Sequence, residues 1–258
     1  MKKIIKKTLI FGPLALVGWA LLFVGWNLVF PSMSKLKTEN PKTTSFMAYR
    51  QAQLKSKGRT KGLTQLWVPM SQISPYLVNA VIISEDDLFW QHNGFDWKAI
   101  KEAYEQNRIR KEVHFGGSTI TQQLAKNLFL SPSRSIFRKA REAILTWRLE
   151  RVLTKNRILE LYLNVVEWGD GIYGAEAAAA YYYQTRAINL TPDESARLAA
   201  VLPQPRRYTP LKIRNSDYLL ERSQEILAIM RKRGVLKLDD QEPLTDPLNE
   251  PEIIKEQN

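Results

Sequence analysis

The sequence predicts an all-α, mainly helical fold preceded by one N-terminal transmembrane helix. From Leu66 to about Leu236, apolar residues recur at helical spacing and no alternating strand pattern persists. Helix start and stop residues punctuate this stretch, and an apolar run stands near the N-terminus. A chain of 258 residues has room for one sizeable domain with a short accessory lobe.

The apolar run covers residues 8–30, and Asn27 is its only strongly polar side chain. A helix of about 20 apolar residues crosses the hydrocarbon core of a membrane, so this run is long enough to span it. A cleaved signal peptide is the alternative, although its apolar part is usually only ~7–15 residues long. Residues 1–7 form a basic tail that favours a cytoplasmic N-terminus. Basic residues also follow the span, so charge alone leaves the orientation open.

Composition and apolar spacing predict the next elements along the chain. Residues 31–62 are polar and basic, which indicates a juxtamembrane connector with a short helix near Phe46 to Leu54. The apolar stretch from Leu77 to Ile83 predicts a buried helix. The body of the molecule, residues 63–238, is expected to be one globular domain.

Two later helices carry explicit end signals. Thr191 to Glu194 combines an N-cap threonine, a proline for the first turn and a glutamate three residues after the cap. This start predicts a helix over residues 195–202, which prolines then end. Another helix is expected from Ser216 to Arg233, closed by Gly234. Residues 239–258 are acidic and proline-containing, and we expect a disordered tail there.

Charge and cysteine content limit the chemistry. The absence of cysteine excludes disulfides, thiolate metal sites and thiol nucleophiles. The net charge is +12, and residues 239–258 contribute −6, so the rest of the chain carries +18. A basic body of this kind suits an anionic partner such as nucleic acid, anionic lipid or a phosphorylated substrate.

The first chemical segment begins with Glu85, Asp86 and Asp87 at the end of the expected buried helix. The negative end of a helix dipole and the mutual repulsion of these acids disfavour ionisation there. Crowding and partial burial would raise one carboxyl pKa, as a general base requires. A solvated acidic turn would explain the same residues.

The second segment, from Gly116 to Asn127, places two glycines and hydroxyl residues before a helix. Free backbone N–H groups at such a helix start can bind an anion. Thr119, Gln123 and Lys126 would share one polar stripe, while an ordinary capped amphipathic helix is the alternative. The Gly-Lys-Ser/Thr end of a P-loop is missing.

The third segment contains Arg138 and Glu142, which are four residues apart and share a helix face. Either they form an exposed ion pair of little energetic value, or the Glu142 carboxylate orients cations toward a diphosphate.

The fourth segment, Lys155 to Ala180, contains a helix, a glycine-rich turn and the start of another helix. We interpret it as mainly structural, with Tyr162 and Asn164 as candidates to line the cleft.

Together these segments resemble the peptidoglycan glycosyltransferase family, specifically its monofunctional membrane-bound members. The first matches Glu-Asp-x-x-Phe-x-x-His-x-Gly and the second matches Gly-Gly-Ser-Thr-Ile-Thr-Gln-Gln-x-x-Lys-Asn. The third matches Arg-Lys-x-x-Glu, and the fourth matches Ile-Leu-Glu-x-Tyr-Leu-Asn and Gly-x-Gly-x-Tyr-Gly. The similarity extends from about Phe46 to Tyr208.

The resemblance implies a lysozyme-like helical head with a smaller membrane-facing lobe, and a defined reaction. Glu85 would take the proton from the 4-hydroxyl of lipid II, which attacks the growing glycan on undecaprenyl diphosphate with inversion to a β-1,4 bond. Glu142, the second catalytic residue, would act on the leaving-group side. By analogy with inverting glycosidases, Glu85 and Glu142 should stand at least ~6.5–9.5 Å apart and face one cleft.

The resemblance also implies the remaining site residues, the cofactors and the location. The expected substrate-binding set is Asp86, Phe89, His92, Ser118, Thr119, Gln123, Lys126, Asn127, Arg134, Arg138 and Lys139. Mg²⁺ or Mn²⁺ could assist, no organic cofactor is expected, and His92 and His114 lack the paired spacing of a zinc site. The partners implied are lipid II, the nascent glycan strand and the membrane, with cell-wall synthesis or division proteins left open. The enzyme would be single-pass in the bacterial cytoplasmic (inner) membrane, with its catalytic domain extracytoplasmic (periplasmic).

Other functions are less consistent with the sequence. A lytic enzyme would need an acid for a sugar leaving group, whereas cations suit a diphosphate, and a wall-binding scaffold would not need Glu85. No nucleic-acid-binding motif is present, so nucleic acid is not an expected partner. Transpeptidase activity is not expected, because the Ser-x-x-Lys matches lie in the connector and no Lys-Thr-Gly follows.

Overall fold

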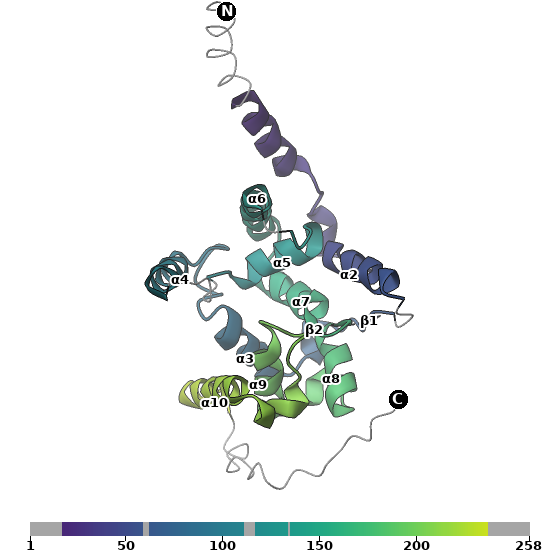
Figure 1. Cartoon of the computed structure of the whole chain (residues 1–258), viewed down its shortest axis with the longest axis vertical. Coiled ribbons are helices and arrows are strands. Elements are labelled where there is room, and N and C mark those ends of the chain that lie inside the picture. The colour runs from purple at the N-terminus through teal and green to yellow at the C-terminus, as the bar shows by residue number, and fades with distance from the viewer. Residues whose placement is uncertain (1–16, 59–61, 111–116, 134, 237–258) are drawn as a thin grey trace, which may run out of the picture. The chain divides into compact units, whose positions relative to one another are not determined.

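The structure, a computed structural model, describes residues 17–58, 62–110, 117–133 and 135–236. Its chain folds into two compact units (Figure 1). Unit 1 comprises the chain up to Leu63 and Leu88–Val166, and unit 2 comprises Thr64–Asp87 and the chain from Glu167 onward. Helices dominate both units, which confirms the mainly helical prediction. The four N-terminal lysines and the acidic tail lie outside the described residues.

Unit 1 is built around α5. Its elements are the N-terminal helix over residues 17–29, η1 (Ser34–Lys37), α2 (Ser45–Ser56), α4 (Trp97–Arg110), α5 (Ile120–Phe129), α6 (Ile136–Val152) and α7 (Lys155–Val165). Helix α5 packs against α2, α6 and α7. Ile120 and Leu124 are completely buried and Leu128 nearly so, and these residues form the inward face of this helix. The helix expected near Phe46 to Leu54 is α2.

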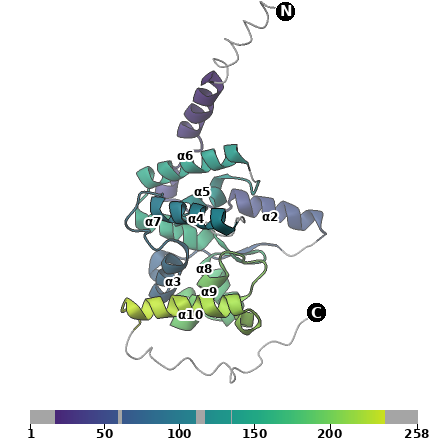
Figure 2. The ribbon, with the colours of Figure 1, turned by 60° about the vertical axis from the view of Figure 1, so that its left-hand side comes forward.

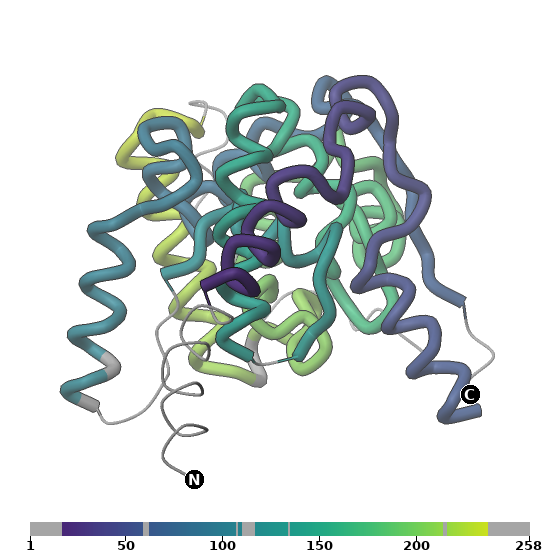
Figure 3. The backbone as a smooth tube through the Cα atoms, turned by 90° about the horizontal axis from the view of Figure 1, so that it is seen from above, coloured from purple at the N-terminus to yellow at the C-terminus, as the bar shows by residue number. Residues whose placement is uncertain are grey.

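The N-terminal helix is the described part of the apolar run. The segment Val17–Lys37 is long and apolar enough to cross a membrane. Most of its large side chains are exposed, with Leu22 74% and Trp26 62% accessible. The path from this helix through η1 into α2 can be followed in Figure 3.

Unit 2 is a second helical group. Its elements are η2 (Met70–Gln72), α3 (Pro75–Glu85), α8 (Ala175–Tyr183), η3 (Ala187–Asn189), α9 (Pro192–Val201), η4 (Pro210–Asn215) and α10 (Asp217–Lys232). Helices α3, α9 and α10 pack against one another (Figure 2). Helix α3 is the buried helix predicted around Leu77 to Ile83, with Leu77 and Val81 fully buried.

The predicted helix ends in unit 2 are confirmed with small shifts. Thr191 and Glu194 form a reciprocal capping box, and α9 therefore begins at Pro192, three residues before the predicted start. Ser216 caps α10, and Gly234 adopts φ 66° just beyond its end.

Unit 2 also contains a small sheet that the sequence does not predict. The strands β1 (Thr64–Gln65), β2 (Glu167–Gly169) and β3 (Ile172–Tyr173) pair in the order β1-β3-β2. The β1–β3 pair is parallel and the β2–β3 pair is antiparallel. Strands of two or three residues are too short to show an alternating pattern, which explains the omission. The glycine-rich turn of the fourth segment joins β2 to β3.

Candidate active site

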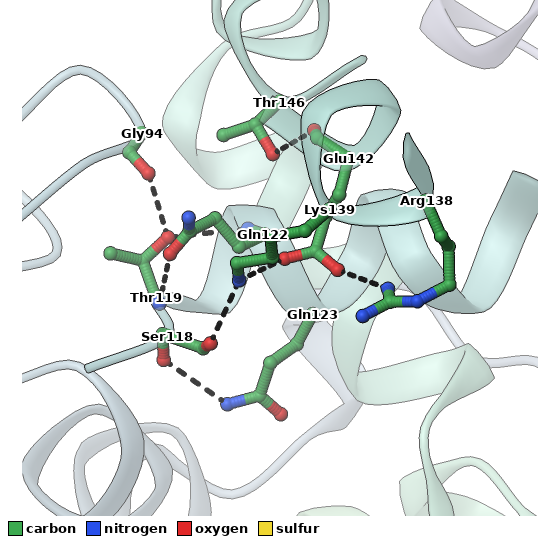
Figure 4. Close-up of polar contacts among 9 residues, drawn as sticks. All are labelled: Gly94, Ser118, Thr119, Gln122, Gln123, Arg138, Lys139, Glu142 and Thr146. Atoms are coloured by element: carbon green, nitrogen blue, oxygen red, sulfur yellow. Dashed lines mark hydrogen bonds and ion pairs between the residues drawn. The ribbon is translucent and has the colours of Figure 1, made fainter. Parts of the chain in front are cut away.

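Helix α6 carries a buried carboxylate that holds two cations. Oε2 of Glu142 accepts from Nη1 of Arg138 at 2.6 Å, and Oε1 accepts from Nζ of Lys139 at 2.5 Å (Figure 4). The Glu142 side chain is only 3% exposed, whereas that of Lys139 is 46% exposed. A buried charge of this kind is stable only when it is paired, so Glu142 fixes the positions of both cations. The group carries a net charge of +1 toward the surface.

This cation cluster reaches the start of α5. Nζ of Lys139 lies 3.4 Å from Oγ of Ser118, and Nε2 of Gln123 lies 3.5 Å from the Ser118 carbonyl oxygen (Figure 4). The hydroxyl of Tyr162 donates to Oε1 of Gln123 at 3.0 Å. The structure therefore brings together Ser118, Gln123, Lys139 and Glu142 of the predicted set, with Tyr162 of α7, a candidate from the fourth segment.

Thr119 is the N-cap of α5 rather than a member of its polar stripe. Its Oγ1 accepts from the Gln122 amide, and Oε1 of Gln122 accepts from the Thr119 amide, which completes a capping box. The same hydroxyl donates to the Gly94 carbonyl at 2.8 Å (Figure 4). Thr119 is 2% exposed, so this geometry favours positioning of the first segment against the second over direct substrate contact.

The glycine before Ser118 has a packing role. A Cβ on Gly117 would stand 2.8 Å from Cα of Ile100 and 3.0 Å from the carbonyl oxygen of Ala99, both backbone atoms of α4. A side chain there would require the backbone to move. Only glycine allows this approach, which is a reason for its presence besides the predicted anion-binding role.

The rest of the first segment is held by contacts within its own loop and with α7. Phe89 is completely buried, with Nζ of Lys155 4.4 Å from its ring centroid. Nδ1 of His92 accepts from the amide of Gly94 at 3.1 Å. The assignment of Phe89 and His92 to the substrate-binding set stays a prediction, and these contacts favour a role in shaping the loop.

The remaining substrate-binding candidates of the second and third segments are Lys126, Asn127 and Arg134. Lys126 stands over the Phe46 ring at 5.6 Å, and Asn127 is buried on the same helix. Arg134 and Gly116 lie outside the described residues.

Unit 2 supplies Glu85, the last residue of α3. Its side chain is 9% exposed, and Oε1 lies 3.6 Å from Nη2 of Arg222. The same nitrogen donates to the carbonyl oxygen and to Oγ of Ser84, both at 2.9 Å. Arg222 on α10 therefore braces the end of α3 and stands beside the carboxylate of Glu85.

The neighbouring acids also differ from the sequence prediction. Asp87 forms a two-pronged ion pair with Arg233, at 2.6 and 2.8 Å, and this hydrogen bonding raises the pKa of Arg233. Asp86 is buried. Arginines 137 and 146 residues away along the chain offset the repulsion predicted among these acids. Helical spacing within one segment does not predict Arg222 or Arg233 as partners of these acids.

Glu85 and Glu142 lie in different units, so their predicted separation stays a prediction. Their side chains are 9% and 3% exposed. Within the described residues, no group of three or more His, Asp or Glu side chains is placed to hold a metal ion. Both oxygens of Glu142 already hold cationic side chains, so a divalent ion would have to displace one of them. Metal assistance remains an expectation from the resemblance.

The chain thus has a mainly helical body and a buried carboxylate–cation cluster. The family model described as Transglycosylase matches residues 51–231, so the chain belongs to the transglycosylase family. The curated relatives make the class more specific.

A biosynthetic peptidoglycan transglycosylase of Azoarcus sp. (strain BH72) is 52% identical over 197 residues, which is 76% of this chain and 85% of the relative. Proteins of the same name from Aromatoleum aromaticum and Dechloromonas aromatica are 55% and 49% identical, covering 66% and 75% of this chain and 74% and 78% of their own lengths. The enzyme class is thus that of the peptidoglycan glycosyltransferases.

Proposed function

We propose that the enzyme elongates glycan chains by moving the growing glycan from undecaprenyl diphosphate to the 4-hydroxyl of lipid II. The reaction would invert the anomeric carbon, form a β-1,4 bond and involve no transpeptidation. The observation that carries this proposal is the buried Glu142 holding Arg138 and the half-exposed Lys139. A diphosphate leaves as an anion, and preorganised cations stabilise the charge that develops on it.

The geometry favours a supporting role for Glu142. Each of its oxygens is committed to one cation, so it orders Arg138 and Lys139 for the diphosphate rather than exchanging a proton. Ser118, within reach of Lys139, would add a hydroxyl donor to the same group.

Glu85 is the proposed general base. Its oxygen would accept the proton of the 4-hydroxyl while that oxygen bonds to the anomeric carbon and the bond to diphosphate breaks on the opposite face. Placement at the nearly buried end of α3, braced by Arg222 and Ser84, supports this role because a base must be held in one orientation.

The test is incubation of purified full-length protein with labelled lipid II, with and without Mg²⁺ or Mn²⁺. We expect Glu85→Gln to lower polymer formation by at least ~100-fold while lipid II still binds. Glu225→Gln is the matched control, because Glu225 is an exposed glutamate on α10. Normal polymerisation by Glu85→Gln would contradict the proposal, and short hydrolysed fragments from the wild type would indicate a lytic enzyme instead.

We also propose that residues 8–30 anchor the enzyme in the cytoplasmic membrane, with the N-terminus inside and the catalytic body outside. The apolar, exposed N-terminal helix supports the anchor, and the need to build the polymer outside the membrane supports the orientation. Because the chain lacks cysteine, single introduced cysteines can be labelled with an impermeant reagent. Residues of α10 should label in intact spheroplasts, and residues 1–7 only after lysis.

A further inference from the structure

Arg148 of α6 binds the end of the N-terminal helix. Its guanidinium donates to the carbonyl oxygens of Asn27 at 2.8 Å, Val29 at 3.0 Å and Pro31 at 2.8 Å. The last carbonyl oxygens of a helix lack intrahelical partners and form the negative end of the helix dipole. A cation placed there donates hydrogen bonds to these oxygens and compensates the negative charge of the dipole. Burial lowers the pKa of Arg148, yet a guanidinium stays charged in proteins.

Arg157 of α7 binds the next part of the chain in the same way. Its Nε donates to the carbonyl oxygen of Leu36 at 2.8 Å, and its Nη2 donates to the carbonyl oxygen of Glu39 at 3.0 Å. Nη2 also donates to Oδ1 of Asn40 at 2.8 Å. Glu160, one turn along α7, pairs with Nη1 and holds the guanidinium in place.

Aromatic side chains add a third contact. Trp19 stacks on Phe23 in the N-terminal helix, and Phe137 at the start of α6 meets Trp19 edge to face with centroids 5.3 Å apart. Phe137 directly precedes Arg138 in the sequence. The N-terminal helix therefore contacts α6 near both ends of that helix.

We infer that Arg148 and Arg157 are positioning residues, which clamp the membrane anchor and thereby hold the cation cluster of α6 at a fixed height over the membrane. Glu142 and Arg148 are six residues apart on one helix, so about 9 Å of rigid helix links the clamp to the cluster. The inference rests on the proposed function, in which the diphosphate lies at the membrane surface.

The clamp contrasts with the polar connector predicted from sequence. If residues 31–44 were a flexible linker, the r.m.s. distance between its two ends would be about 20 Å. The cluster would then meet a membrane-held diphosphate in only a fraction of conformations, and the apparent KM would rise by the inverse of that fraction.

The experiment compares Arg148→Ala/Arg157→Ala with wild type in proteoliposomes and in detergent micelles. In proteoliposomes we expect KM for lipid II to rise about tenfold, as for a competent population of about 10%, with kcat little changed. In micelles, where lipid II is not confined to a plane, the change should be below about twofold. Equal losses in both media would overturn the inference.

Arg151→Ala is the matched control, because Arg151 is an exposed arginine of α6 that stacks on Trp147 and should leave KM unchanged. Arg148→Lys should rescue little, since an ammonium lacks the fork that reaches three carbonyls. Spin labels on cysteines introduced at the exposed Leu22 and Ile136 should give a narrow distance distribution that broadens in the double variant.

The label distances keep the two proposals separable. Wild-type protein that makes no polymer would refute the proposed function, while the distances would still report on the clamp. A distribution that stays equally narrow in the double variant would refute the clamp, whatever the activity.

Discussion

At the scale of single residues, the acids of the candidate site pair with both local and long-range cations. The i, i+4 spacing of Arg138 and Glu142 predicts their pairing, and the structure confirms it. The same reasoning does not find Arg222 beside Glu85, because these residues are distant in sequence and meet only when α10 packs on α3. Local spacing therefore predicts pairs within one helix, whereas pairs between helices require the packed fold.

The Glu85–Arg222 pair makes a specific kinetic prediction. Arg222→Ala should lower kcat by about tenfold, or about 1.4 kcal/mol, because a base free to rotate is less often aligned. KM should change little, and Arg222→Lys should recover part of kcat. Arg231→Ala, an exposed change on the same helix, serves as control. Steady-state kinetics with lipid II measure the split, and a rise in KM at constant kcat would contradict the positioning role.

We predict that a side chain at Gly169 lowers the free energy of unfolding. A Cβ at this position would lie 2.1 Å from Oη of Tyr182, which donates to the Trp168 carbonyl at 3.3 Å. Gly169→Ala should therefore destabilise the protein by about 1–3 kcal/mol, as overpacking does. Tyr182→Phe should relieve part of that cost, measured as a coupling free energy in a double-mutant cycle by thermal unfolding. Gly62→Ala, in open space, should be nearly neutral, and strict additivity of the two changes would contradict the clash.

Tyr182 also predicts a pH dependence. Burial, followed by the nearby Tyr181, Asp170 and Glu167, raises the pKa of Tyr182 from 10.0 to about 12. Between these values the unfolded chain has lost the proton and the folded protein retains it, so the free energy of unfolding falls as pH rises from 10 to 12. Tyr182→Phe should flatten this fall in urea titrations, and an identical slope in wild type and variant would contradict the assignment.

At the scale of elements, helix ends are the features that sequence predicts best. Thr191 with Glu194, Ser216 and Gly234 mark real ends, because capping depends on residues a few positions apart. The three short strands and the tight approach of Gly117 to α4 depend instead on partners elsewhere in the chain, and sequence spacing does not reveal them.

Helix α5 allows a test of capping combined with a tertiary contact. Thr119→Ala removes the N-cap, worth about 0.5–2 kcal/mol, and leaves the Gly94 carbonyl without its donor, worth about 1–3 kcal/mol more. Thr154→Ala, which removes the hydroxyl that caps α7, should cost only the first amount. Denaturant titrations compare the two, and Thr119→Ser should restore most of the loss. Equal costs for both alanine variants would show that the Gly94 contact contributes nothing.

At the scale of the whole molecule, the first motif runs from unit 2 into unit 1, so the chain itself links the proposed base to the loop beside the cation cluster. The expectation of one domain over residues 63–238, with a smaller lobe, stays a prediction, because helical periodicity is the same in both units and does not mark their boundary. Family membership does extend over both, from residue 51 to residue 231.

The separation of Glu85 and Glu142 is the prediction that belongs to this scale. By analogy with inverting glycosidases, we predict that the two carboxyl groups stand at least ~6.5–9.5 Å apart and face one cleft. A disulfide needs Cβ atoms about 3.5–4.5 Å apart, so Glu85→Cys/Glu142→Cys should not close one under mild oxidant. A bis-maleimide whose spacer matches the predicted separation should cross-link the pair, and the native chain has no cysteine to interfere. The single-cysteine variants control for reaction between molecules. Rapid disulfide formation, or failure of every spacer length to cross-link the pair, would contradict the proposed arrangement, in which Glu85 and the cation cluster face one cleft.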